Sequence, residues 1–286
     1  RAPKDNDAHS PLVLGKQNWF TKQYDHPKRT CLEVRQGNGA EEPSLVYTTA
    51  YQTEKDNFYV TIGLWQAGQN RIFIDCNVQS PAEMLSPGRI GMTAILPVRF
   101  TAMNWYGKGP LETYPDRQCG GRMGVYSEDV RNQSFYLRPQ EYGLHTESRS
   151  MRLTDPDRAD FVRFEAACPM AMSAVPYSDL QLWNARHPHE LPAPEALYVH
   201  LDYAHRGLGN SSCGPDALPT YRIDDRPCRF GFALEAGLGE REDNPFGPIP
   251  EEIPAYHPWK AVEEQDRTPS YRDPSDPDQR SNAGMV

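Results

Sequence analysis

The sequence contains no apolar run close to the roughly 20 residues that a membrane-spanning helix requires. Basic residues are in the minority, because 30 Lys and Arg stand against 39 Asp and Glu and give a net charge of −9. An acidic chain without a basic stripe argues against nucleic acid and against a membrane surface as partners. A dinucleotide fingerprint, a phosphate-binding glycine loop and a Ser-His-Asp arrangement are also missing. No signal peptide is visible, but Arg1 falls inside a motif described below, so we expect the true N-terminus to lie upstream.

Cysteine is present without the spacing of a metal site. None of the six cysteines forms a C-x-x-C pair, which argues against structural zinc. We expect reduced, mostly buried thiols of a cytoplasmic protein at Cys31, Cys76, Cys119, Cys168, Cys213 and Cys228. His187 and His189 stand in a His-Pro-His-Glu sequence, but no third ligand is in view, so we expect a solvated loop there and no metal.

The strongest pattern in the chain is the alternation of apolar and polar residues, which is typical of half-buried strands. Turn-forming sequences such as Asn38-Gly39 separate the alternating segments. Many short alternating strands predict an all-β fold, a large antiparallel β-sandwich, and not a βαβ fold. One short helix is predicted over Tyr177–His187, with Ser178 as its N-cap and Pro188 as its stop. The predicted strands are Ser44–Gln52, Phe58–Trp65, Arg71–Val78, Phe161–Cys168, Leu197–Tyr203 and Arg229–Glu235.

The composition divides the chain into two regions. Residues 8–30 are polar and predicted to be irregular, and from Gly237 onwards fifty residues carry eight prolines, many acids and little apolar periodicity. Such a segment cannot bury a core of its own. We therefore predict one β-sandwich domain over residues 1–236 and an irregular extension over 237–286. Phe246, Tyr256 and Trp259 are the side chains that could dock part of this extension.

One stretch, Trp105–Arg117, concentrates stiff, aromatic and charged residues. Its glycines and prolines predict that it runs as neither a helix nor a regular strand. The large surfaces of Trp105 and Tyr114 favour burial. Glu112, Asp116 and Arg117 are predicted to form a buried ion-pair and hydrogen-bond network that ties loops to a sheet. A direct role in ligand binding is the alternative.

The stretch reads Trp-x-Gly-x-Gly-Pro-x-Glu-x-Tyr-Pro-Asp-Arg and resembles the signature of the last domain, or small chain, of the β-galactosidases of glycoside hydrolase family two. Three further segments resemble the same domain in the same order. They are Arg1–Asp7, Pro139–His145 (with Tyr142 where the family has Asn) and Gly207–Pro215. Together the four segments span residues 1 to about 235.

The resemblance implies a galactose-mutarotase-like supersandwich and a part in a retaining glycoside hydrolase that acts on terminal β-D-galactosides such as lactose. Retaining hydrolysis needs two carboxyl groups roughly 5 Å apart. Glu112 and Asp116 could supply them, but Arg117 beside them favours an ionised structural pair. In the family both catalytic glutamates lie in a preceding (β/α)₈ barrel, so we expect no catalytic residue and no turnover in this chain alone.

Further partners and groups follow from the same resemblance. We expect the barrel domain, or a large chain carrying it, as the partner, and a homo-oligomer of the full enzyme. Magnesium and sodium are expected in the barrel, and no cofactor or metal in this chain. The Gly207–Pro215 loop is expected to line the sugar pocket through Asn210, Ser211, Ser212 and Cys213. Part of the family has an aromatic residue where Cys213 stands, and a thiol offers a sugar ring a smaller surface.

The opening segment has a corresponding role in the family. Asp5, Asn6 and Asp7 match the entry to a loop that borders the active site. From the residues alone, this segment reads as an N-terminal turn and the Cys213 loop as a β-turn with an inert thiol.

Two other functions stay open. One is a free-standing epimerase similar to the aldose mutarotases, with His145 and His200 as acid/base groups and Glu112 or Glu147 as their partner. The other is a non-catalytic carbohydrate-binding or scaffold domain. Convergence of the two histidines with a carboxylate in one pocket would favour the epimerase.

Overall fold

The computed structural model describes residues 4, 7, 10–16, 18–37, 42–53, 56–133 and 136–239. Asp5, Asn6 and residues 240–286 of the predicted extension, with Phe246, Tyr256 and Trp259, lie outside the described residues. Antiparallel strands dominate the described part. They are β1 (Lys28–Gln36), β2 (Leu45–Gln52), β3 (Asn57–Gln66), β4 (Arg71–Gln79), β5 (Arg89–Pro97), β6 (Ala102–Gly109), β7 (Arg122–Asp129), β8 (His145–Thr154), β9 (Phe161–Val175), β10 (Ala196–His205) and β11 (Cys228–Gly237).

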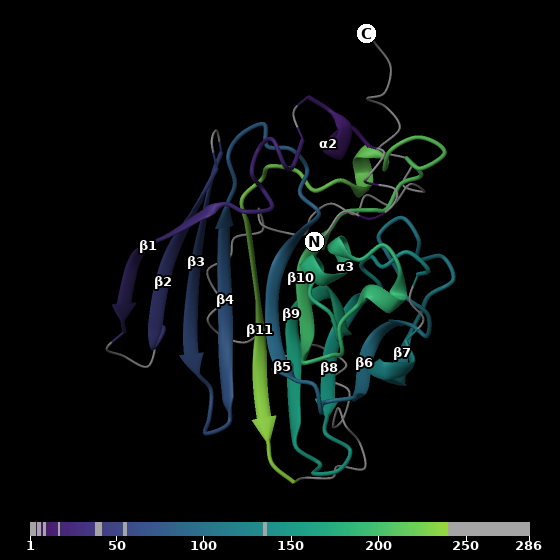
Figure 1. Cartoon of the computed structure of the whole chain (residues 1–286). Coiled ribbons are helices and arrows are strands. Elements are labelled where there is room, and N and C mark those ends of the chain that lie inside the picture. Colours follow the sequence, from purple (N-terminus) through teal and green to yellow (C-terminus); the bar gives the residue numbers. More distant parts are fainter. Residues whose placement is uncertain are drawn as a thin grey trace, which may run out of the picture.

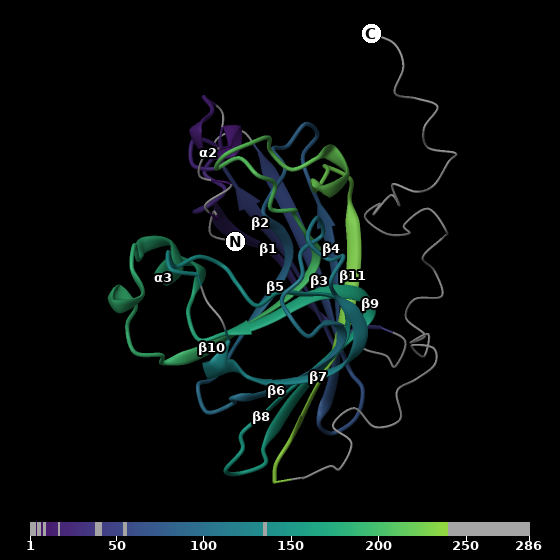
Figure 2. The ribbon, with the colours of Figure 1, turned by 90° about the vertical axis from the view of Figure 1, so that its right-hand side faces the viewer.

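All these strands belong to one sheet, with the order β1-β2-β3-β4-β11-β9-β8-β6-β7 along its main path (Figure 1). The long strand β9 pairs with β11 over residues 161–166 and with β10 over residues 171–175. Strand β10 in turn carries β5. Strands β10 and β11 thus pair with successive parts of β9. Figure 2 shows that β10 runs at a large angle to β11.

The main core lies within this curved sheet. A single cluster of buried side chains draws members from β3 and β4 near one end of the sheet order, and from β6 and β8 near the other. Alternate residues of a strand point to one face. The predicted alternation is confirmed at Val199 and Leu201 of β10 and at Phe230 and Phe232 of β11, which all belong to the cluster. One sheet therefore packs against itself as a β-sandwich.

The six predicted strands are present as β2, β3, β4, β9, β10 and β11. Five strands were missed, namely β1, β5, β6, β7 and β8, and physical reasons stand out for β1 and β8. Strands β1 and β5 each pair with one neighbour, and β1 is exposed on both faces along nearly its whole length. Such an edge strand has no buried face to impose alternation. Strand β8 buries polar residues, His145, Ser148 and Arg152, so it does not read as an apolar face.

The expectation that Trp105–Arg117 avoids regular strand was wrong for its first part. Residues 105–109 are the end of β6, which pairs with both β7 and β8. Gly107 does not form a turn but allows the backbones of β6 and β8 to lie close together, because a Cβ at this position would lie 2.8 Å from the Cα of Ser148 on β8. Glycine within a strand commonly marks such a contact.

The predicted helix is present but shorter. Helix α3 spans Asp179–Asn184, and Ser178 caps it in a reciprocal arrangement with Gln181, as a capping box does. It ends at Asn184, with Ala185 as its C-cap, before Pro188 is reached, and Pro188 opens a separate 3₁₀ turn. A four-residue helix α2 (Pro11–Leu14) lies in the segment predicted to be irregular. No helix in the described part is long and apolar enough to cross a membrane.

The cysteines are free, but the prediction that most are buried was wrong. Only Cys76 is buried, and its position in the core raises the pKa of its thiol to about 12. Cys31, Cys119 and Cys213 are exposed because they lie on an edge strand and in two surface loops.

Candidate functional site

The turn between β6 and β7, residues 110–121, is the centre of the candidate site. Tyr114 has no exposed surface, and its backbone exchanges two hydrogen bonds of 3.1 and 2.8 Å with Arg117. Thr113 donates its N–H to the carbonyl of Leu144 at 2.6 Å. The predicted segment Pro139–His145 therefore lies directly against this turn and holds it in one shape.

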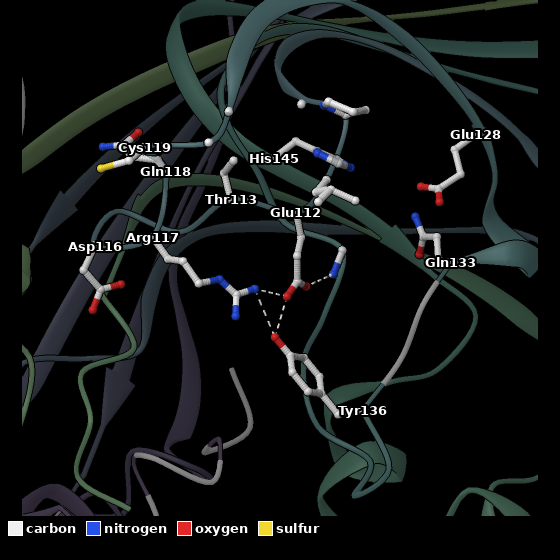
Figure 3. Close-up of a pocket in the computed structure, with 16 residues that line it drawn as sticks. Glu112, Thr113, Asp116, Arg117, Gln118, Cys119, Glu128, Gln133, Tyr136 and His145 are labelled. Atoms are coloured by element: carbon white, nitrogen blue, oxygen red, sulfur yellow. Dashed lines mark hydrogen bonds and ion pairs between the residues drawn. The ribbon is translucent and has the colours of Figure 1, made fainter. Parts of the chain in front are cut away.

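Glu112 is fully engaged within the turn (Figure 3). Its Oε1 accepts hydrogen bonds from the Arg117 guanidinium and the Tyr136 hydroxyl, and its Oε2 accepts one of 2.9 Å from the N–H of Gly143. Burial and the bond to Glu112 raise the pKa of Tyr136 to about 12. The Arg117 side chain is 49% exposed. The pair exists as predicted, but it lies at the surface and is not buried.

Asp116 does not join this pair. Its two carboxylate oxygens accept hydrogen bonds from the N–H groups of Leu208 at 2.9 Å and Gly209 at 2.7 Å. The backbone approaches so closely that a Cβ at Gly207 would lie 2.8 Å from the Asp116 carboxylate carbon. In Figure 3 Asp116 points away from Glu112, so the predicted network of three charges is split in two. Asp116 instead positions the Gly207–Pro215 loop.

The tip of this loop is presented outward. The carbonyl of Asn210 accepts hydrogen bonds from the N–H groups of Cys213 at 2.9 Å and Gly214 at 2.6 Å, which closes a tight turn. Ser212 and Cys213 are exposed, whereas Ser211 is half-buried and its hydroxyl oxygen has no hydrogen-bond partner. The base of the loop is therefore held by Asp116 while its tip is open to a neighbour.

The N-terminal segment is tied to the same place by two long-range contacts. Lys4 donates from Nζ to the Tyr114 hydroxyl at 2.8 Å. Asp7 accepts from Nη1 of Arg206 at 3.1 Å, and Nη2 of Arg206 donates to Asp216 at 2.6 Å. Arg206 has no exposed surface and Asp7 almost none. All four segments singled out in the sequence thus meet around one turn.

A buried histidine completes this junction. His205 places Nδ1 2.8 Å from the carbonyl oxygen of Arg206 and Nε2 2.7 Å from a carboxylate oxygen of Glu141. Because a carbonyl only accepts, the imidazole donates from Nδ1 to Arg206, and its other nitrogen lies within hydrogen-bond distance of Glu141. Sequence reasoning missed Glu141, His205 and Arg206. Glu141 lies within a recognised segment and Arg206 directly before one, which was the available signal.

His145 and His200 do not converge. His145 stacks on Trp105 with ring centroids 3.9 Å apart, and burial lowers its pKa to about 4. His200 bonds to Thr93 at 3.0 Å, and burial lowers its pKa to about 3. His145 is paired with Met172 on β9 and His200 with the adjacent Ser173. Adjacent residues of a strand point to opposite faces, so the two imidazoles lie on opposite faces of the sheet.

Potential metal ligands do not cluster in the described part of the chain. Within it, no group of three or more His, Cys, Asp or Glu is arranged to hold a metal ion. His187 and His189 stack on one another with centroids 5.4 Å apart. The turn borders a cavity of about 630 Å³, which also contacts Glu128, Gln133 and His145 (Figure 3).

A comparison with known families covers all four segments singled out in the sequence. A family model described as the β-galactosidase small chain matches residues 1–234. The chain belongs to the β-galactosidase small-chain family. The resemblance noted at the Trp105–Arg117 motif is confirmed over nearly the whole described structure.

Individual relatives of the small-chain family are β-galactosidases. One from Staphylococcus xylosus is 26% identical over 82% of this chain and 23% of its own length. One from Pseudoalteromonas haloplanktis is 30% identical over 83% of this chain and 23% of its own length. One from Arthrobacter sp. (strain B7) is 33% identical over 56% of this chain and 16% of its own length. The chain thus spans about a quarter or less of these relatives.

The similar solved structures include two proteins of the aldose epimerase group. A putative aldose 1-epimerase from Escherichia coli K12 gives a TM-score of 0.38 at 8% identity, over 72% of this chain and 69% of that one. A GalM/aldose epimerase homologue from C. elegans gives a TM-score of 0.38 at 10% identity, over 81% of this chain and 72% of that one.

Proposed function

We propose that this small chain forms one wall of the galactoside pocket of a β-galactosidase whose catalytic barrel lies outside this sequence. The observation that carries the proposal is the Gly207–Pro215 loop, which Asp116 holds at its base while Ser212 and Cys213 stay exposed at its tip. A surface loop with a fixed base and an open tip is suited to a neighbouring domain. The full enzyme hydrolyses terminal β-D-galactosides such as lactose.

In this proposal the chemistry is divided between the two parts. The barrel provides the two carboxyl groups of a retaining mechanism, together with the expected magnesium and sodium ions. Glu112 and Asp116 have a structural task, since all four of their carboxylate oxygens accept hydrogen bonds within this chain. The small chain helps to orient the sugar relative to the catalytic groups, and orientation alone contributes much to such rates.

The N-terminal segment supports the same arrangement. Lys4 contacts Tyr114 of the Trp105–Arg117 motif. Asp7 contacts Arg206, which directly precedes the Gly207–Pro215 loop, called the wall loop from here on. We propose that Asp5, Asn6 and Asp7 border the pocket with Asn210–Cys213, next to the barrel domain or the large chain. In this proposal residues 1–236 form the β-sandwich domain of the enzyme, and residues 237–286 form an extension of that domain. A cytoplasmic homo-oligomer is part of the proposal, and the free cysteines fit a reducing compartment.

The experiment that tests the wall is Cys213→Trp in the complete enzyme, barrel included. An indole face added to a sugar pocket contributes about 1 kcal/mol of contact, so KM or kcat/KM for galactosides should change severalfold. The matched control is Cys31→Trp, at another exposed cysteine on the edge strand β1. Unchanged kinetics in a well-folded Cys213→Trp enzyme would place the loop outside the pocket.

A second measurement tests whether the catalytic groups lie in the barrel and not in this chain. The isolated chain should not hydrolyse a chromogenic β-galactoside, because the covalent step needs the barrel carboxylates. Turnover by the pure chain that Glu112→Gln abolishes would place the catalytic pair here. Turnover that persists in Glu112→Gln would reveal a catalytic site elsewhere in the chain. Either result would refute the proposed division.

A further inference from the structure

The cavity beside the motif has the dimensions of a small-molecule site. Its volume is about 630 Å³, and the Gly109–Gly121 turn forms most of its lining. Small-molecule sites commonly enclose roughly 300–1,000 Å³. Asp116 stands at the end nearest the wall loop, while Glu128 and Gln133 stand at the other end (Figure 3). The cavity is therefore a feature separate from the exposed tip at Cys213.

Gln133 is the observation that points to a ligand. Its side chain lines the cavity and is only 6% exposed, and neither its amide oxygen nor its amide nitrogen has a hydrogen-bond partner. A Cβ on Gly143, where φ is +72°, would lie 3.1 Å from this oxygen, so the amide lies against bare backbone. A buried acceptor without a donor is unfavourable for stability. A ligand hydroxyl would satisfy it.

The groups around Gln133 define what kind of ligand fits. Glu128 lies beside Gln133 (Figure 3); burial raises the pKa of Glu128, and the neighbouring Gln133 side chain partly offsets the rise. His145 is neutral at pH 7, since burial lowers its pKa to about 4. The Arg117 cation is already paired with Glu112. The cavity thus offers an amide with both an acceptor and a donor, and an acidic end, which rejects anions and favours a neutral ligand whose groups can both donate and accept.

The rest of the lining suits the carbon skeleton of such a ligand. The ring of Tyr136 and the backbone of Gly109, Gly120 and Gly121 present flat surfaces without long side chains. Sugars combine donor hydroxyl groups with an apolar face of C–H groups, and aromatic rings pack on such faces. We propose that this cavity binds a neutral hexose unit, with Gln133 and Glu128 accepting hydrogen bonds from its hydroxyl groups. This goes beyond the proposed function, because it gives the small chain a ligand site of its own.

The test is a titration of the full 286-residue chain with methyl β-D-galactopyranoside, followed by nuclear magnetic resonance or calorimetry. We expect saturable binding with a dissociation constant of about 1 mM, as is common for small polar ligands. Gln133→Leu and Glu128→Gln should each weaken the affinity by about fivefold or more, because each removes an acceptor. Gln79→Leu, at an exposed glutamine on β4, should leave it unchanged.

Gln133→Leu also separates a ligand role from a structural one. It removes a buried amide whose oxygen is unpartnered and keeps a similar volume, so the melting temperature should stay equal or rise while binding is lost. A melting temperature that falls together with the affinity would mean that Gln133 supports the fold, and would overturn its role as a ligand group. If Gln133→Leu does not fold, the loss of affinity is measured with Glu128→Gln, a substitution at a half-buried side chain.

Several outcomes would overturn the proposal. They are the lack of saturable binding to the folded chain, unchanged affinity in both cavity variants, and tighter binding of methylammonium than of the galactoside, which would make this a cation site. The wall proposal can fail independently. Cys213→Trp tests the wall by kinetics of the complete enzyme and should not change sugar binding to this cavity.

Discussion

Asp116 accepts a 2.7 Å hydrogen bond from the backbone N–H of Gly209, a residue 93 positions later in the chain. Gly209 adopts a φ of +63°, a conformation in which glycine is favoured. The N–H of Leu208 binds the other carboxylate oxygen, so one side chain of the motif caps two consecutive amides of the wall loop. This contact joins the Trp105–Arg117 motif of the small chain to the segment proposed to face substrate.

The first prediction concerns this cap. Asp116→Ala should reduce the free energy of unfolding by about 2–3 kcal/mol, because it leaves two amides without their charged acceptor. Hydrogen exchange at the amides of Leu208 and Gly209 should accelerate at the same time. Glu195→Ala, at an exposed carboxylate, is the control and should change neither quantity. Unaltered exchange at both amides in Asp116→Ala would contradict the cap.

The second prediction concerns the buried pair of Arg206 and Asp7. Arg206→Met should destabilise the chain by about 3 kcal/mol or more in urea unfolding, since it strands a buried carboxylate. Arg206→Lys should not restore stability, because an ammonium cannot reach both Asp7 and Asp216. Arg226→Met is the control, as that guanidinium is 59% exposed and its pair should contribute less than about 1 kcal/mol. Equal losses in Arg206→Met and Arg226→Met would show that burial does not matter here.

The third prediction concerns Arg117, which the sequence placed in a buried network. With its side chain about half exposed, Arg117→Ala should lower the free energy of unfolding by only about 1 kcal/mol. In a domain of this size that corresponds to about 2–4 °C in melting temperature. Glu112 keeps the Tyr136 hydroxyl and the Gly143 amide as partners, which limits the loss. A loss near 3 kcal/mol would restore the buried-network interpretation.

The fourth prediction concerns pH. Burial lowers the pKa of His145 from 6.5 to about 4, so the unfolded chain binds this proton more readily than the folded one. The contribution of neutral His145 to the free energy of unfolding is complete above pH 6.5 and is lost as the pH falls towards 4. At pH 5 the free energy of unfolding is lower by about 2 kcal/mol for this reason. His200 acts in the same direction. Asp202 opposes both, because burial raises its pKa to about 6 and its protonated form is favoured in the folded chain.

The measurement that isolates His145 is a comparison of urea unfolding at pH 7 and pH 5. His145→Gln should lose about 2 kcal/mol less between the two pH values than the parent does. His26→Gln, at an exposed histidine, is the control and should keep the pH dependence of the parent. An identical pH dependence in His145→Gln and the parent would mean that His145 titrates normally in the folded chain.

Local patterns predicted much of the fold. The alternation of Val199 with Leu201 and of Phe230 with Phe232 was enough to place their strands and their buried faces. Ser178 was enough to place the start of α3. These features depend on neighbours within a few residues, so the sequence carries them directly. The edge strand β1 escaped prediction because an exposed strand is specified by its partner and not by a buried face of its own.

Within the site, the sequence by itself determined the family and the four segments that matter, because their residue order is a local property of the chain. Only the tertiary structure decided how the charges pair. It separated Asp116 from Glu112, joined Arg206 to Asp7 and left the amide oxygen of Gln133 without a donor. These contacts depend on strand register and loop placement, which bring together side chains up to 199 residues apart. The partner of a charged side chain is therefore a property of the whole fold, whereas its presence in a motif is a property of the sequence.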